Sequence, residues 1–228
     1  MVLAENVSIG YAEKKVLEKI SFKIPLDKTT VIMGPGASGK TTILKILVGA
    51  PNKDNLWYTG DLNFPKLTPF FCPQNKEFQT QKSLQLLLNE HYPSTTAVTF
   101  LNSMYSSFPT LATNLINSLS VPLCELPVAT AKIAYLSIAF ANKYSYVILD
   151  EPERYLESNE REWLISKILE FKNEKTIIIA SHNLLFSRKV ADYVMLFVYG
   201  ELIESGMKND FFSHPQHART KQYLIYGS

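Results

Sequence analysis

The chain has 228 residues, of which 46% are hydrophobic and 19% charged, so it is long and apolar enough to bury a core and is not a disordered chain. The formal net charge is only +2, so the overall charge does not indicate nucleic-acid binding. Cys72 and Cys124 are far apart in the sequence and fit no metal-ligand spacing, which favours two reduced thiols.

Residues 1–15 contain no basic segment followed by an apolar one, so we expect no signal peptide. The longest apolar run, YVMLFVY at residues 193–199, is far shorter than the roughly 20 residues of a membrane-spanning helix. We therefore expect a soluble, cytoplasmic protein that reaches a membrane only through a partner.

The first ~30 residues alternate apolar and polar side chains in NVSIGY and KKVLEKISFKI, which predicts a half-buried antiparallel sheet. Residues 29–33 (TTVIM) predict a buried strand that ends in a glycine-rich turn. Residues 41–49 (TTILKILVG) then predict a short helix with Gly49 as its C-terminal cap.

The middle of the chain is nearly uncharged, since residues 78–124 carry only Lys82 and Glu90. Pieces such as KSLQLLLNEHY and TNLINSLS predict an inserted, mostly helical subdomain. Depletion of charge is typical of an interface core, and it is equally compatible with a neutral solvated surface. The sequence leaves both interpretations open.

Three more apolar runs, YVILD, KTIIIAS and DYVMLFVYG, predict buried strands. Between the first two, residues 159–173 have apolar side chains at helical spacing. Continuous apolar strands separated by helices predict an α/β fold with a mostly parallel sheet and helices on both faces.

Residues 34–41 (GPGASGKT) match the pattern G-x-x-x-x-G-K-[ST], after a predicted strand and at the start of a predicted helix. In such a P-loop, backbone N–H groups from Gly36 to Lys40 wrap a β-phosphate, Lys40 reaches the β- and γ-phosphates, and the Thr41 hydroxyl ligates Mg²⁺. A fortuitous glycine-rich turn would give this match in roughly one chain in a hundred.

Other candidate residues follow predicted strands. In VILDEP, Asp150 can hold the Mg²⁺ hydration shell, and Glu151 can orient or deprotonate an attacking water. His182 in IIIASHN can bind a γ-phosphate, although a lone histidine at a strand end is more often structural. Gln74 can ligate Mg²⁺ or position a water, but a lone glutamine is weak evidence for either role. Tyr11 can stack on a base or belong to the core of a hairpin.

The order of these pieces resembles the ATP-binding subunit of ABC (ATP-binding cassette) transporters over essentially the whole chain. The insertion of roughly 50 residues after Gln74 separates this pattern from simpler P-loop kinases and GTPases. By this resemblance, Tyr11 stacks on adenine, Gln74 senses Mg²⁺ and couples to a membrane subunit, Glu151 is the catalytic carboxylate and His182 is the switch histidine. The implied fold is a P-loop α/β core with an antiparallel β subdomain and a helical subdomain.

The resemblance implies one ABC ATPase domain over residues 1–228, with subdomains at 1–73 (antiparallel β and P-loop core), 74–130 (helical insert) and 131–228 (the rest of the core and the tail). The implied cofactors are ATP and Mg²⁺. The predicted nucleotide-binding residues are Tyr11, Gly34, Gly36, Ala37, Ser38, Gly39, Lys40, Thr41, Thr42 and Gln74. The predicted metal-binding residues are Thr41, Gln74 and Asp150, and the predicted catalytic residues are Lys40, Glu151 and His182.

The sequence departs from the family at the LSGGQ signature, whose position is taken by LPVAT at residues 126–130. Pro127 replaces the serine hydroxyl that contacts ATP bound to the opposite subunit, and Val128 and Ala129 replace two glycines. Loss of several phosphate donors would cost several kcal/mol of transition-state stabilisation, since one such donor is worth about 3 kcal/mol. A second departure is RYLE at residues 154–157, where the family usually has Ser-Ala-Leu-Asp.

Two functions are compatible with these features. The first is a transport ATPase that lies on the inner face of the cell membrane, with a membrane permease and a second ATPase chain as partners. The tail, residues 190–224, is similar to that of phosphate-importer ATPases, so phosphate or another small anion is the expected cargo. The second is a weakly hydrolysing regulatory module or heterodimer partner. The sequence does not decide between import and export or between a homodimer and a heterodimer.

Overall fold

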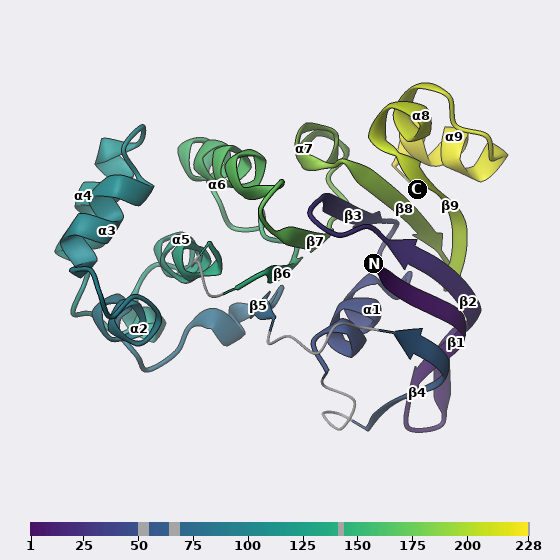
Figure 1. Cartoon of the computed structure of the whole chain (residues 1–228), viewed down its shortest axis with the longest axis horizontal. Coiled ribbons are helices and arrows are strands. Elements are labelled where there is room, and N and C mark those ends of the chain that lie inside the picture. Colours follow the sequence, from purple (N-terminus) through teal and green to yellow (C-terminus); the bar gives the residue numbers. More distant parts are fainter. Residues whose placement is uncertain (50–54, 64–68, 141–143, 228) are drawn as a thin grey trace.

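The computed structural model describes residues 1–49, 55–63, 69–140 and 144–227. These residues form a six-stranded sheet, a three-stranded sheet and the helices around them (Figure 1). The strands are β1 (Val2–Tyr11), β2 (Lys14–Ile24), β3 (Thr29–Met33), β4 (Leu56–Asn63), β5 (Phe70–Cys72), β6 (Tyr146–Asp150), β7 (Thr176–Ala180), β8 (Tyr193–Val198) and β9 (Glu201–Met207). The helices are α1 (Lys40–Leu47), α2 (Leu84–His91), α3 (Ala97–Met104), α4 (Pro109–Asn117), α5 (Val128–Ala139), α6 (Ser158–Phe171), α7 (Leu184–Val190), α8 (Lys208–Ser213) and α9 (Ala218–Tyr226), with short 3-10 turns η1 (Lys76–Phe78) and η2 (Leu123–Glu125).

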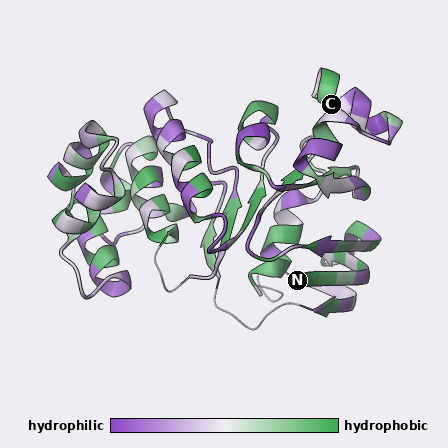
Figure 2. Cartoon of the chain, turned by 45° about the horizontal axis from the view of Figure 1, so that its top comes forward, coloured by the Kyte–Doolittle hydropathy of each residue, from purple (hydrophilic) through white to green (hydrophobic). Residues whose placement is uncertain are grey.

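The six-stranded sheet has the order β5-β6-β7-β3-β8-β9. Its first five strands are parallel, and β9 runs antiparallel to β8 at one edge. Every residue of β3, β6 and β7 is buried, and these strands show as a hydrophobic centre in Figure 2. The predicted α/β fold with a mostly parallel sheet is confirmed, because strands covered on both faces need continuous apolar sequences.

Both faces of this sheet are covered. Val31 and Met33 of β3 belong to a core shared with α5, α6 and α7. Ile32, which points to the opposite face, belongs to a second core shared with α1 and the strands β1 and β2. The predicted helices on both faces are therefore present, and on one face the three-stranded sheet completes the cover.

The three-stranded sheet has the order β2-β1-β4, and both of its strand pairs are antiparallel. The alternating pattern of the first ~30 residues thus predicted β1 and β2 correctly, with Val7 opposite Ile20. The third strand, β4, is separated from β1 by β2, β3 and α1. The alternation of the N-terminal residues therefore gave no signal for its pairing.

The short helix after the P-loop also follows its prediction. Helix α1 ends at Leu47, and Gly49 adopts φ 71° while its N–H donates to the carbonyl of Ile46 at 3.0 Å. A left-handed glycine at this position satisfies helix carbonyls that have no partner within the helix.

Helices α2, α3 and α4 lie in the nearly uncharged segment and project to one side of the sheets (Figure 1). Ser83 and Thr96 cap α2 and α3, since their hydroxyls accept bonds from Leu86 N at 3.3 Å and Thr99 N at 3.2 Å. The ring of Tyr105, just after α3, stacks on Trp163 of α6 with 4.6 Å between ring centroids. The helical segment is thereby attached to the main core. No helix within the described ranges combines the length and apolar character that crossing a membrane requires.

Candidate functional site

The P-loop connects β3 to α1 in a backbone conformation that requires glycine. Gly34 has φ 147°, and a Cβ atom there would lie 1.9 Å from the carbonyl oxygen of Phe197 in β8. Gly39 has φ 96° and is the residue before the first turn of α1. Ala37 also adopts positive φ, 59°. The loop therefore has the strand-loop-helix context that a phosphate-binding motif needs.

Lys40, the first residue of α1, turns its ammonium group back into this loop. The side chain is 7% exposed, and Nζ donates to the carbonyls of Gly34 and Pro35 at 2.8 Å each. Burial lowers the pKa of this ammonium, while the carboxylates of Glu151 and Asp150 oppose the shift. The loop thus encloses a cation beside backbone N–H groups at a helix N-terminus, an arrangement that favours anions.

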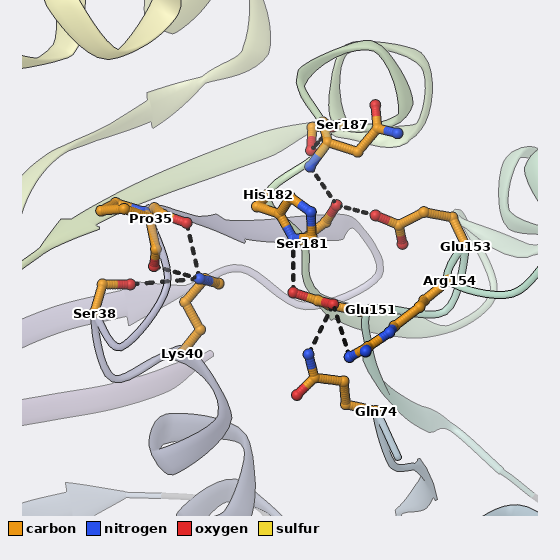
Figure 3. A network of polar contacts seen from close by, with 12 residues as sticks. Pro35, Ser38, Lys40, Gln74, Glu151, Glu153, Arg154, Ser181, His182 and Ser187 are labelled. Carbon is orange, nitrogen blue, oxygen red and sulfur yellow. Dashed lines mark hydrogen bonds and ion pairs between the residues drawn. The ribbon is translucent and has the colours of Figure 1, made fainter. Parts of the chain in front are cut away.

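Glu151 lies immediately after β6, with φ 41°, and its N–H donates to the carbonyl of Ala180 at 2.9 Å. Its carboxylate accepts a bond from Gln74 Nε2 at 2.8 Å on Oε2 and from His182 Nδ1 at 2.7 Å on Oε1 (Figure 3). Arg154 Nη1 lies 3.9 Å from Oε2. Gln74 and His182, two predicted site residues distant in the sequence, therefore both contact the carboxylate of a third, Glu151.

This environment sets the protonation of Glu151. Burial raises the pKa of its carboxyl, but the hydrogen bonds from Gln74 and His182 outweigh burial, and the net pKa lies below its usual range. The residue is consequently ionised at neutral pH, with a hydrogen-bond donor on each of its two oxygens.

Asp150, the last residue of β6, is 1% exposed. Burial raises the pKa of this carboxyl, and a hydrogen bond with the Thr41 side chain opposes the shift. Its Oδ2 atom is buried without a hydrogen-bond partner in the described part of the chain. A buried carboxylate oxygen without a donor is suited to a cation.

The predicted metal-binding residues fit Mg²⁺. They offer a hydroxyl oxygen from Thr41, an amide oxygen from Gln74 and the carboxylate of Asp150, and oxygen is the ligand type that Mg²⁺ selects. The unpartnered Oδ2 of Asp150 supports this fit, because a coordinated cation or its water would satisfy that atom.

A cavity of about 480 Å³ opens beside the P-loop. It is lined by Lys14, Lys15, Val16, Ala37, Ser38, Gly39, Lys40, Thr41, Thr42, Gln74, Glu151 and Tyr199. Most of the predicted phosphate-binding residues and both Gln74 and Glu151 therefore share one cavity. Cavities of this size bind nucleotide-sized ligands.

Other predicted residues lie around this cavity without lining it. His182 contacts Glu151, and its side chain is 64% exposed. Tyr11, at the end of β1, contributes no part of the lining formed by the described residues. The centre of its ring is instead 5.7 Å from Lys45 Nζ on α1.

Sequence reasoning missed four charged or aromatic side chains in this region. Tyr199 lies in the turn between β8 and β9, and Lys14 and Lys15 begin β2. Arg154 belongs to the RYLE departure, but its proximity to Glu151 was not predicted. The unusual charge at position 154, two residues after the DEP sequence, was the available signal.

The LPVAT segment forms the start of α5, as its place in the sequence predicted. Pro127 is the residue before the helix, and no side chain caps this end. Helix α5 packs against β5 and η1. The helix is therefore retained, while the hydroxyl and the glycines of the family signature are absent.

Comparison with known proteins identifies the family. The family model described as ABC transporter matches residues 17–154, well over half of the chain. The chain belongs to the ABC transporter family. The matched residues include the P-loop, Gln74, the LPVAT segment and the carboxylates that end β6.

The ABC family assignment agrees with curated relatives. The chain is 26% identical to "Phosphate import ATP-binding protein PstB 2" of Mycobacterium tuberculosis, over 97% of this chain and 87% of the relative. It is also 26% identical to "Phosphate import ATP-binding protein PstB" of Saccharolobus solfataricus, over 93% and 90%. A "Probable amino-acid ABC transporter ATP-binding protein" of Haemophilus influenzae is 25% identical over 99% and 95%.

Solved structures show the same ABC fold. "Structure of ATP binding subunit of ABC transporter" matches with TM-score 0.76 and 18% identity, over 98% of this chain and 94% of the other. "Structure of a bacterial Atm1-family ABC exporter with ATP bound" matches with TM-score 0.80 and 16% identity, over 98% of this chain and 42% of the other. The predicted P-loop core and antiparallel β subdomain therefore belong to a known fold.

Proposed function

We propose that this chain is the ATP-binding and ATP-hydrolysing subunit of an ABC importer. The observation that carries the proposal is the convergence of Gln74 and His182 on the Glu151 carboxylate, which lines the same cavity as Lys40. A phosphate cradle and a restrained, ionised carboxylate in one cavity are the parts that phosphoryl transfer to water requires.

The P-loop would hold the phosphates of ATP. Backbone N–H groups of Gly36 to Lys40 would donate to the β-phosphate, and Lys40 would exchange its bonds with Gly34 and Pro35 for phosphate oxygens. Ala37, Ser38, Gly39, Thr41 and Thr42 line the same cavity. When bound, Mg²⁺ would neutralise phosphate charge, and Thr41, Gln74 and Asp150 are the residues that would hold it.

Glu151 would act on the attacking water. The carboxylate is ionised at neutral pH, so it is available to orient this water and to accept its proton. Gln74 and His182 each hold one of its oxygens and so fix the direction of proton acceptance. The largely exposed His182 ring would also reach a γ-phosphate. Tyr11 would stack on adenine at the end of β1, outside the phosphate cavity.

The subunit would work with a permease on the inner face of the cell membrane, and with a second ATPase chain. Phosphate or another small anion is the cargo that the tail and the names of the two PstB relatives support. A relative named for amino acids is nearly as similar, so identity alone does not separate these cargoes. The proposal also includes a single ABC ATPase domain with subdomains at residues 1–73, 74–130 and 131–228.

A second candidate function is supported by the start of α5. Pro127 brings neither a hydroxyl nor an N–H group, and Val128 and Ala129 replace glycines. A chain with this segment would offer few hydrogen-bond donors to ATP bound by a partner chain. It would act as a weakly hydrolysing regulatory module or as one half of a heterodimer. Its own Lys40 and Glu151 site would then depend on the signature of a different chain.

Steady-state ATP hydrolysis by the purified chain, with Glu151→Gln as the control, separates these functions. Turnover well above that of Glu151→Gln supports an enzyme built from identical chains. Turnover equal to that control contradicts that enzyme and supports the second candidate. In that case, restoring the signature with the triple variant Pro127→Ser, Val128→Gly and Ala129→Gly should raise turnover.

A further inference from the structure

The carboxyl ends of β6 and β7 are joined by a contact that the proposed chemistry does not use. The two strands are parallel neighbours, with Asp150 opposite Ala180. Glu153 follows β6 and Ser181 follows β7, so their side chains meet beyond the sheet edge. The Ser181 hydroxyl donates to Glu153 Oε1 (Figure 3).

The backbone on both sides of His182 is held by hydrogen bonds, and the Ser181 hydroxyl takes part in them. Before it, the Ser181 N–H donates to the carbonyl of Ile32 in β3 at 3.1 Å. After it, the Asn183 N–H donates to Ser181 Oγ at 3.0 Å. Asn183 in turn caps α7, since its Oδ1 accepts the N–H of Phe186 at 3.0 Å. Glu153 is therefore the buried end of a chain of bonds that passes around His182 to α7.

The His182 ring itself has little support from packing, because 64% of its side chain is exposed. Its orientation depends on its backbone and on the 2.7 Å contact between Nδ1 and Glu151 Oε1. We propose that Glu153 is a positioning residue that holds the Ser181–Asn183 backbone so that His182 stays aligned with Glu151. This inference rests on the proposed function, because the alignment matters for ATP hydrolysis.

Burial strengthens the argument, since Glu153 is only 6% exposed. Its Oε2 atom has no hydrogen-bond partner within the ranges that the structure covers. Burial also raises the pKa of this carboxyl, against the hydrogen bond from Ser181. A buried acid costs stability, so a residue chosen only for stability here would be apolar. What the buried Glu153 carboxylate provides in exchange is the hydrogen bond that it accepts from Ser181.

The first test is kinetic, with Glu153→Ala, Glu153→Gln and Ser181→Ala compared with Glu162→Ala, a change at an exposed glutamate on α6. Glu153→Ala should lower kcat roughly tenfold or more while KM for ATP changes less than about twofold, because the P-loop is untouched. Glu153→Gln keeps an acceptor for Ser181 and should retain most of kcat. The Glu153→Ala/Ser181→Ala double variant should be no slower than either single variant, as expected for one coupled contact.

The second test does not depend on turnover. The chain has four histidines, so ¹⁵N-histidine labelling resolves His182, assigned with His182→Gln. Glu153→Ala should shift and broaden the His182 ring signals and leave those of His214 and His217 unchanged, whereas Glu153→Gln should leave all of them near wild type. Unchanged His182 signals in Glu153→Ala overturn the inference, and so does an equal shift in Glu153→Gln. A wild-type chain without ATP hydrolysis would contradict an enzyme built from identical chains, and the histidine spectra would still decide the role of Glu153.

Discussion

Replacing Lys40 with methionine tests the phosphate site most cleanly. Methionine keeps the unbranched side chain and removes the charge. At 4 Å and an effective dielectric constant near 20, one charge pair is worth about 4 kcal/mol. The remaining N–H groups of the loop stay in place and part of the attraction is offset by desolvation, so we expect a loss of about 2–4 kcal/mol, or roughly 30- to 700-fold in Kd for MgATP.

The fold should tolerate this change. The Gly34 and Pro35 carbonyls lose their 2.8 Å bonds to Nζ. Burial lowers the Lys40 pKa, however, so the charged ammonium costs free energy in the folded state and its removal offsets that loss. We expect the melting temperature to stay within about 4 °C of wild type, which corresponds to about 1 kcal/mol for a chain of this length.

Calorimetric titration with MgATP measures the effect, and Lys189→Met is the control. Lys189 is exposed on α7 and is not among the residues that line the cavity. A folded Lys40→Met protein that binds MgATP within threefold of wild type would refute the reasoning. An equal loss in Lys189→Met would refute it as well, because the effect would then reflect general charge.

Two further predictions concern stability. Gly34→Ala should lower the free energy of unfolding, measured by urea denaturation, by roughly 2–4 kcal/mol, because φ is 147° and the new Cβ would lie 1.9 Å from the Phe197 carbonyl oxygen. Gly36→Ala is the control and should lower it far less, because no described atom lies within 4 Å of the new Cβ. Equal losses would contradict this assignment of strain. The pKa of Glu153 is raised by burial, so the stability contributed by its protonated form is complete below about 4.5 and is lost as pH rises through its folded-state pKa. The melting temperature of Glu153→Gln relative to wild type should therefore increase from pH 4.5 upward, and a difference independent of pH would contradict the buried ionisation.

Local patterns predicted the parts of the fold that local sequence controls. The buried strands β3, β6 and β7 are short apolar runs, and the P-loop is defined by glycines that permit positive φ at Gly34 and Gly39. Asp150 and Glu151 were found because they end such a run. These features need no knowledge of distant contacts.

Contacts between distant segments were harder to predict. Gln74 and Glu151 are 77 residues apart, and the resemblance to a known family, not the glutamine itself, indicated a role for Gln74. The bond between Ser181 and Glu153 had no signal in either segment alone, because it depends on the register of β6 against β7. The place of Tyr199 in the cavity depends on the turn between β8 and β9 lying beside the first residues of β2.

The central claim is that Glu151 is the general base for hydrolysis of ATP bound beside Lys40. Single-turnover hydrolysis of γ-³²P-labelled ATP, with the protein in excess and Mg²⁺ present, measures this step without the contribution of product release. The account predicts that Glu151→Gln binds MgATP as tightly as wild type and cleaves it about 10²- to 10⁴-fold more slowly, the usual contribution of general base catalysis. Equal cleavage rates in wild type and Glu151→Gln would contradict the account.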